Sequence, residues 1–86
     1  MITGGWTTVS VMPSTGWSNV FRQDGRETGV PSPAILLQQA SGGQTRAVFA
    51  AIARGGELVP AVDVPGYVRT LSSETLALQQ SPHAGY

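Results

Sequence analysis

The sequence of 86 residues contains no cysteine and no lysine, and only 12% of its residues carry a charge. Without cysteine, disulfides and thiolate metal sites are excluded. Small secreted domains often rely on disulfides, so this absence favours the cytoplasm or a particle assembled there. The segment from Met1 to Gly5 has neither the basic nor the apolar region of a signal peptide, and we expect no secretion by that route. The longest apolar run, 47–53, is far shorter than the ~20 residues that span a bilayer, so no membrane partner is expected.

The few charges present are balanced, with five basic and five acidic residues and a net charge of zero. An average domain has about 25% charged residues. The arginines are scattered and form no basic stripe, so nucleic acid is not expected as a partner. Low charge at zero net charge favours self-association or membership of a larger assembly. A monomer with a neutral surface of Ser, Thr, Gln and Gly explains the composition equally well.

The length is sufficient for one domain with a thin core, which buries about 60–65% of the surface that the unfolded chain exposes. A compact chain of this length has a radius of gyration near ~12 Å. It leaves no room for the cleft between two lobes in which most enzymes of small molecules work.

Eleven glycines and six prolines divide the chain into short segments, which suit strands better than helices. The pair Asp24-Gly25 is a strong hairpin signal. Alternation along the first segment places Trp6, Thr8, Ser10 and Met12 on one face, with Thr7, Val9 and Val11 on the other. Residues 26–33 hold two prolines and are predicted as loop or edge. The predicted strands are 6–12, 17–23, 34–39, 45–53, 57–62 and 67–71.

We therefore predict an all-β fold, a small antiparallel meander or SH3-like barrel of about five short strands. Residues 1–71 form the single domain, and residues 72–86 form a C-terminal arm or tail. Ser72 or Ser73 can cap a short helix in this arm. The alternative is an α+β fold with residues 33–54 helical, since Ser32-Pro33 and Gly42 provide helix start and stop signals.

Four short motifs stand between residues 16 and 71: Gly16-Trp17 with Val20, Thr45-Arg46-Ala47-Val48, the run from Gly55 to Ala61, and Pro65-Gly66-Tyr67-Val68. Together they resemble a group of short β-rich proteins of actinobacteria and their phages and prophages. The resemblance implies a small β-rich fold and an origin in a mobile element, without any activity. Val62 stands where that group often has an acid, so no shared polar site is implied.

No set of residues in the sequence predicts catalysis, a metal site or a cofactor. The single histidine, His83, lies in the predicted tail, where it supplies one ligand at most and no oriented base for a serine nucleophile. Asp24 and Glu27 stand beside arginines, which indicates a paired, solvated loop. The two Gly-Gly pairs lack the Lys-Ser/Thr of a phosphate-binding loop and are typical of turns. The sequence thus predicts no enzyme and no small-molecule substrate.

The aromatic residues are the remaining candidates for a binding site. Trp17, Phe21 and Phe49 are expected mainly in the core, because a thin β-domain needs large side chains to fill it. Trp6 and Tyr67 have Gly or Pro-Gly beside them and are expected at rims, where they contact a partner. Trp17 with Phe21 and Arg22 can also form a stacking platform for single-stranded nucleic acid. The candidate partner-binding residues are Trp6, Trp17, Arg22 and Tyr67.

These patterns favour a non-enzymatic structural or interaction protein that acts through subunit contacts. Its expected setting is a phage or phage-like particle, as a capsid decoration, connector or tail accessory, and its location is cytoplasmic or virion-associated. The alternative is a small β-barrel adaptor that binds nucleic acid or a regulatory protein in the cytoplasm.

Overall fold

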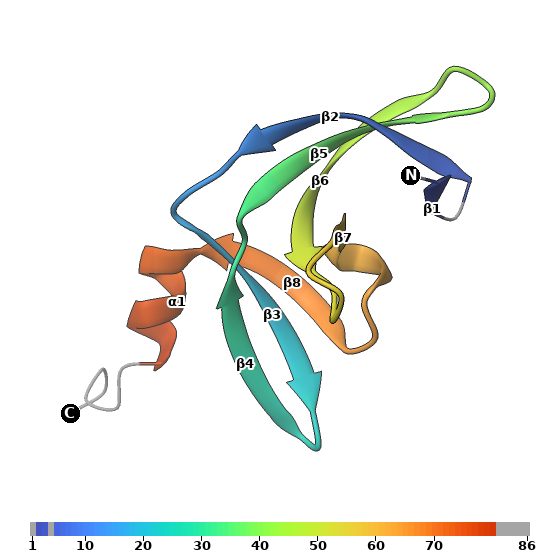
Figure 1. Cartoon of the computed structure of the whole chain (residues 1–86). Coiled ribbons are helices and arrows are strands. Elements are labelled where there is room, and N and C mark those ends of the chain that lie inside the picture. Colours follow the sequence, from blue (N-terminus) through green and yellow to red (C-terminus); the bar gives the residue numbers. More distant parts are fainter. Residues whose placement is uncertain (1, 4, 81–86) are drawn as a thin grey trace.

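The computed structural model describes residues 2–3 and 5–80, and most of them form antiparallel strands. One sheet has the strand order β1-β2-β5-β6-β7 and the other β4-β3-β8 (Figure 1). The strands are β1 (Ile2–Thr3), β2 (Trp6–Pro13), β3 (Trp17–Gln23), β4 (Arg26–Pro31), β5 (Ala34–Ala40), β6 (Thr45–Ile52), β7 (Leu58–Pro60) and β8 (Tyr67–Ser72). A 3-10 helix, η1 (Ala61–Asp63), joins β7 to β8, and the helix α1 (Ser73–Gln80) follows β8.

The prediction of a mostly β chain with a short C-terminal helix is confirmed. The helical alternative for residues 33–54 is wrong, because this stretch forms the hairpin of β5 and β6 around the turn at residues 41–44. Among the described residues, no helix is long and apolar enough to cross a membrane. The predictions for Met1 and for the tail from Ser81 to Tyr86, His83 included, lie outside the described residues.

The two sheets are linked by one long antiparallel ribbon. β2 runs on into β3 and β4 runs on into β5, and the ribbon closes at Asp24-Gly25, where φ is 53° and 77°. Both values lie in the left-handed region that a two-residue hairpin turn requires. At the corner, the Ser14 N–H donates to the Pro33 carbonyl over 3.1 Å and the Ser32 N–H to the Trp17 carbonyl over 2.8 Å. The ribbon therefore stays paired while it passes from one sheet to the other.

The molecule is elongated, with extents of 51 × 25 × 23 Å and a radius of gyration of 14.4 Å. This radius exceeds the ~12 Å expected for a compact chain of this length. The reason is visible in Figure 1, where β2, β5 and β6 arch together away from the smaller sheet. We call the extended part of β2, β5 and β6 the arm, and it lengthens the molecule instead of enlarging a central core.

A small core lies on one face of the larger sheet. It consists of Ala34, Leu36 and Ala50, with Val48 and Leu58 packed against them. These residues alternate along β5 and β6, as expected for strands with one buried face. Three of the five are alanine or valine, so the core is thin, as the length of the chain predicts.

Helix α1 packs on the smaller sheet and buries Leu76. The helix begins after Ser72, whose Oγ accepts a hydrogen bond from the Thr75 N–H over 3.1 Å, and this confirms the predicted cap. Gly29 on β4 makes room for the helix, because a β-carbon there would collide with Leu76 Cδ2. The first part of the predicted C-terminal arm therefore docks on the domain.

The predicted alternation along β2 is wrong beyond Thr8. The pairing with β5 shifts between Thr8 and Ser10, so Val9 is an extra residue in a β-bulge. A bulge reverses the alternation that follows it. Met12 therefore shares a face with Thr7 rather than with Trp6.

The segment 26–33, predicted as loop or edge, forms the edge strand β4 up to Pro31. The Ser32 N–H donates to the Trp17 carbonyl on β3. Since hydrogen-bonded and non-hydrogen-bonded pairs alternate along an antiparallel ladder, the preceding pair of Pro31 and Ser18 exchanges no hydrogen bond, and proline is tolerated there. The missing N–H of Pro31 therefore points to the free edge of the sheet.

Candidate interaction surfaces

The face of the larger sheet opposite the core carries two apolar rows. Met12, Ile35 and Phe49 are paired across β2, β5 and β6, and Leu37 and Ala47 belong to the next row together with Ser10. Paired residues in antiparallel strands share one face. The Trp17 ring lies 5.3 Å from the Phe49 ring and extends the patch. We call this set the outer face: Met12, Trp17, Ile35, Leu37, Ala47 and Phe49.

The outer face is uncharged, and it is exposed except at Ile35 and Phe49, which are half-buried. Met12 is 47% exposed, Trp17 41% and Leu37 36%. The following row, in which Thr7 pairs with Gln39 and Gln39 with Thr45, is also neutral. Exposed apolar residues that gather on one face of a sheet, rather than lying scattered, are typical of interaction sites.

The opposite face of the arm ends in a polar cluster around Gln38, whose side chain is fully buried. Gln38 Nε2 donates to Thr8 Oγ1 over 3.0 Å, and Arg46 Nε donates to Gln38 Oε1 over 2.8 Å. The Arg46 guanidinium also lies 4.4 Å from the centre of the Trp6 ring, in a cation–π contact. Arg46 and Trp6 therefore hold one another within the arm.

The free edge of β2 is a weaker candidate for pairing with another chain. β1 pairs with β2 only at Trp6 and Thr7. Because the Ser14 N–H donates to the Pro33 carbonyl, just before β5, alternation directs the backbone of Val11 and Pro13 outward. Pro13 offers no N–H on this edge, and the bulge at Val9 breaks the regular spacing of hydrogen-bonding groups. Val11, which lies between them, therefore offers an isolated outward N–H. Both features are known to limit edge-to-edge pairing.

A groove with a volume of about 670 Å³ lies between the β3–β4 hairpin, the end of β6 and the loop after η1. Such a volume is within the usual range for binding sites of small ligands or peptide side chains. Its apolar lining comes from all three elements: Phe21 and Val30 on the hairpin, Ile52 on β6, and Val64 and Pro65 in the loop.

A chain of hydrogen bonds runs from the sheet β4-β3-β8 to the other sheet. The Thr70 hydroxyl donates to Asn19 Oδ1 over 2.8 Å, so the Tyr67 hydroxyl, 2.8 Å from Thr70 Oγ1, must donate to Thr70. Asn19 Nδ2 in turn donates to the Ala50 carbonyl over 2.9 Å, which also accepts from Ser32 Oγ over 2.9 Å. Among the described residues, every buried side-chain nitrogen and oxygen has a hydrogen-bond partner.

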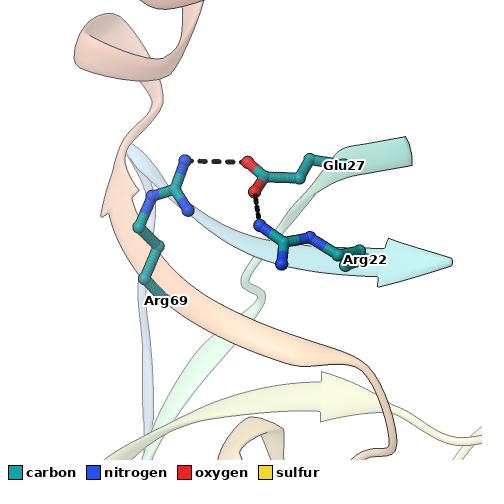
Figure 2. A network of polar contacts seen from close by, with 3 residues as sticks. All are labelled: Arg22, Glu27 and Arg69. Atoms are coloured by element: carbon teal, nitrogen blue, oxygen red, sulfur yellow. Dashed lines mark hydrogen bonds and ion pairs between the residues drawn. The ribbon is translucent and has the colours of Figure 1, made fainter. Parts of the chain in front are cut away.

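Glu27 joins two arginines on the side of the smaller sheet that α1 covers (Figure 2). Its Oε2 lies 2.6 Å from Arg22 Nη2, and its Oε1 lies 2.9 Å from Arg69 Nη2. The hydrogen bond from Arg69, and after it the one from Arg22, lowers the pKa of the Glu27 carboxyl below its ordinary value of 4.5. The carboxylate thereby connects the outer strands β4 and β8 across β3.

We predict that Glu27→Gln makes stability less dependent on pH in acid. Since the folded state lowers the pKa of Glu27, its contribution is complete above pH 4.5 and is lost as the pH falls through the lower, folded-state pKa. Thermal unfolding followed by circular dichroism at a series of pH values should show that Tm falls less in acid for the variant than for the wild type. Gln23→Ala, at an exposed and uncharged position on β3, is the control and should leave the fall of Tm in acid unchanged. Parallel curves for wild type and Glu27→Gln would contradict the prediction.

The four residues predicted to bind a partner do not form one site. Trp6 is held by Arg46 at the start of β2, whereas Tyr67 donates to Thr70 and packs edge-on against Phe21, 6.0 Å between ring centres. Arg22 is bound to Glu27, on the face of β3 opposite Trp17 and Phe21. The stacking platform of Trp17, Phe21 and Arg22 is therefore not assembled.

Sequence reasoning missed Met12 and Leu37 on the outer face and Ile52 at the groove. The signal for Leu37 was present, since it is a large apolar residue in a segment whose alternate positions form the core. Ile52 has the same phase along β6 as the core residues Val48 and Ala50, so alternation predicts it buried, and its exposure depends on where β5 ends. Met12 could not be placed, because the bulge at Val9 changes its face.

Among the described residues, no three histidine, aspartate or glutamate side chains gather where they could hold a metal ion. Comparison with protein-family models, curated proteins and solved structures gives no match to this chain. The function therefore has to be argued from the geometry of the outer face and of the groove.

Proposed function

We propose that this chain is a non-enzymatic structural protein that acts by subunit contacts, as a small component of a phage or phage-like particle. The outer face carries this proposal, because it places exposed apolar side chains on three neighbouring strands with no charge among them. Burial of such a face against another subunit is favoured by about 25 cal/mol per Å² of apolar surface. Strands β2, β5 and β6, which form the elongated arm (Figure 1), carry most of this face, and Trp17 of β3 contacts it at Phe49.

The proposal includes an SH3-like barrel as the framework. Supporting it are the strand orders β4-β3-β8 and β5-β6-β7, the ribbon that bends from one sheet into the other, and a 3-10 helix before the last strand. β1 and β2 then form an addition to the barrel at the free side of β5. In this arrangement the barrel is the support, and the added strand contributes Met12 to the outer face.

We predict that the wild-type protein self-associates and that Leu37→Arg weakens the association at least about tenfold. An arginine in the middle of the outer face would have to lose its hydration without a partner charge when the face is buried. Light scattering coupled to gel filtration, at increasing protein concentration, measures the effect. Val62→Arg is the matched control, because Val62 is also an exposed apolar residue but lies on η1.

The particle version of the proposal is tested by copurification with capsid or tail proteins of a phage particle. Retention of a particle protein by the wild type but not by Leu37→Arg would support it. A protein that stays monomeric at every concentration and retains no particle protein would count decisively against the proposal.

A further inference from the structure

The groove between the β3–β4 hairpin and the end of β6 contains unpaired backbone groups as well as apolar side chains. β5 pairs with β6 only as far as Phe49. Beyond it, the side chains of Asn19 and Ser32 take the place of β5 by donating to the Ala50 carbonyl. Further along this side of β6, among the described residues, no strand faces Ile52.

The direction of the Ile52 backbone follows from its neighbours. The Ala53 N–H donates to Glu57 across the β6–β7 turn, so Ala53 and Ala51 point their backbone groups toward β7. Because the direction alternates along a strand, the N–H and C=O of Ile52 point to the other side, which β5 has left. Ile52 is 63% exposed and lines the groove. A donor and an acceptor therefore stand free beside an apolar hollow.

The charges at the groove favour a basic occupant. Asp24 and Arg22 are the charged residues that line it. The Arg22 guanidinium is bound to Glu27 on the opposite face of the hairpin, whereas Asp24 forms no ion pair within the described part of the chain. The groove thus offers one carboxylate without a counter-charge at the end formed by the hairpin turn.

We infer that this groove binds an extended segment of a partner protein, which adds to β6 at Ile52. The backbone of the segment donates to and accepts from Ile52, as in other cases of strand addition. An apolar side chain of the segment enters the hollow between Phe21, Val30 and Pro65, and a lysine or arginine of the segment pairs with Asp24. This site is independent of the outer face and so does not depend on self-association.

The test is selection of a displayed library of random peptides on the full chain, followed by affinity measurements with the enriched peptide. We expect enriched sequences that combine a basic residue with an apolar residue. Ile52→Pro removes the outward N–H, which no strand of the described residues uses, and should weaken binding about tenfold or more. Ile52→Val keeps the N–H while it also shortens the side chain, and it should bind far more tightly than Ile52→Pro. Asp24→Asn keeps the left-handed turn and should weaken the basic peptides selectively.

Circular dichroism verifies that each variant is folded, and Leu37→Arg should leave peptide binding unchanged even where it abolishes self-association. An absence of enriched sequences, or peptides that bind Ile52→Pro and Asp24→Asn as tightly as the wild type, would overturn the inference. Displacement of the peptide by unlabelled Ile52→Pro, whose own groove no longer binds the peptide, would also overturn it, since the occupant would then be a second copy of this chain.

Discussion

Replacement of Gly66 by alanine is expected to lower the free energy of unfolding by about 3 kcal/mol. Gly66 has a φ of +90°, a conformation that costs an L-residue about 1–2 kcal/mol. A β-carbon there would also stand 2.7 Å from the Arg22 carbonyl oxygen. This neighbour is backbone and cannot move aside, so the collision adds the cost of overpacking, about 1–3 kcal/mol. The hydrogen bond that the Arg22 N–H donates to the Gly66 carbonyl over 2.7 Å would be distorted as well.

Thermal unfolding measures this effect, and about 3 kcal/mol corresponds to a fall in Tm of more than about 10 °C for a domain of this size. Gly43→Ala is the matched control. Gly43 has a φ of +93°, yet nothing lies within 4 Å of its β-carbon position, so only the strain of about 1–2 kcal/mol is expected. Equal losses for the two variants would show that the close approach of Gly66 to β3 contributes nothing.

The strands were predictable where glycine and proline mark their ends. Asp24-Gly25 identified the hairpin of β3 and β4, and the glycines at 42–43 identified the turn before β6. These signals are local, because a turn that needs a positive φ selects its residues directly. The cap of α1 at Ser72 was predictable for the same reason.

Faces and sites were not predictable where they depend on a partner strand. The bulge at Val9 has no signature in the sequence, yet it determines whether Met12 faces the core side or the outer face. The groove joins Phe21, Ile52 and Pro65, which lie far apart in the sequence and meet only after the ribbon has bent. Arg22 was a candidate because of its charge, but its use by Glu27 depends on the register of β3 against β4.

The two surfaces share one structural cause, which is the bend of the ribbon at residues 14–16 and 32–33. The bend carries β5 away from the end of β6 and, among the described residues, leaves the side of Ile52 opposite β7 without a partner strand. It also allows β2, β5 and β6 to extend as an arm on which Met12 and Leu37 of the outer face remain exposed. Residues that hold this bend are therefore expected to matter more than any single exposed side chain.

Asn19→Ala tests this expectation and should lower the free energy of unfolding by about 2–4 kcal/mol. Asn19 is almost fully buried and connects the two sheets, since it accepts from Thr70 and donates to the Ala50 carbonyl. Removal of its amide eliminates two hydrogen bonds, one from the Thr70 hydroxyl and one to the Ala50 carbonyl, and each contributes about 0.5–1.5 kcal/mol. The loss of side-chain volume adds to this cost.

A double-mutant cycle with Thr70→Val separates the hydrogen bond from the lost volume. We expect the two substitutions to be less than additive by about 0.5–1 kcal/mol or more in urea unfolding, because each of them alone already removes the hydrogen bond between Asn19 and Thr70. Gln23→Ala is the control, at an exposed position on the same strand, and should change stability by less than about 0.5 kcal/mol. Strict additivity, or a loss for Asn19→Ala as small as that of Gln23→Ala, would show that the bend is held by the backbone pairs at Ser14 and Ser32 alone.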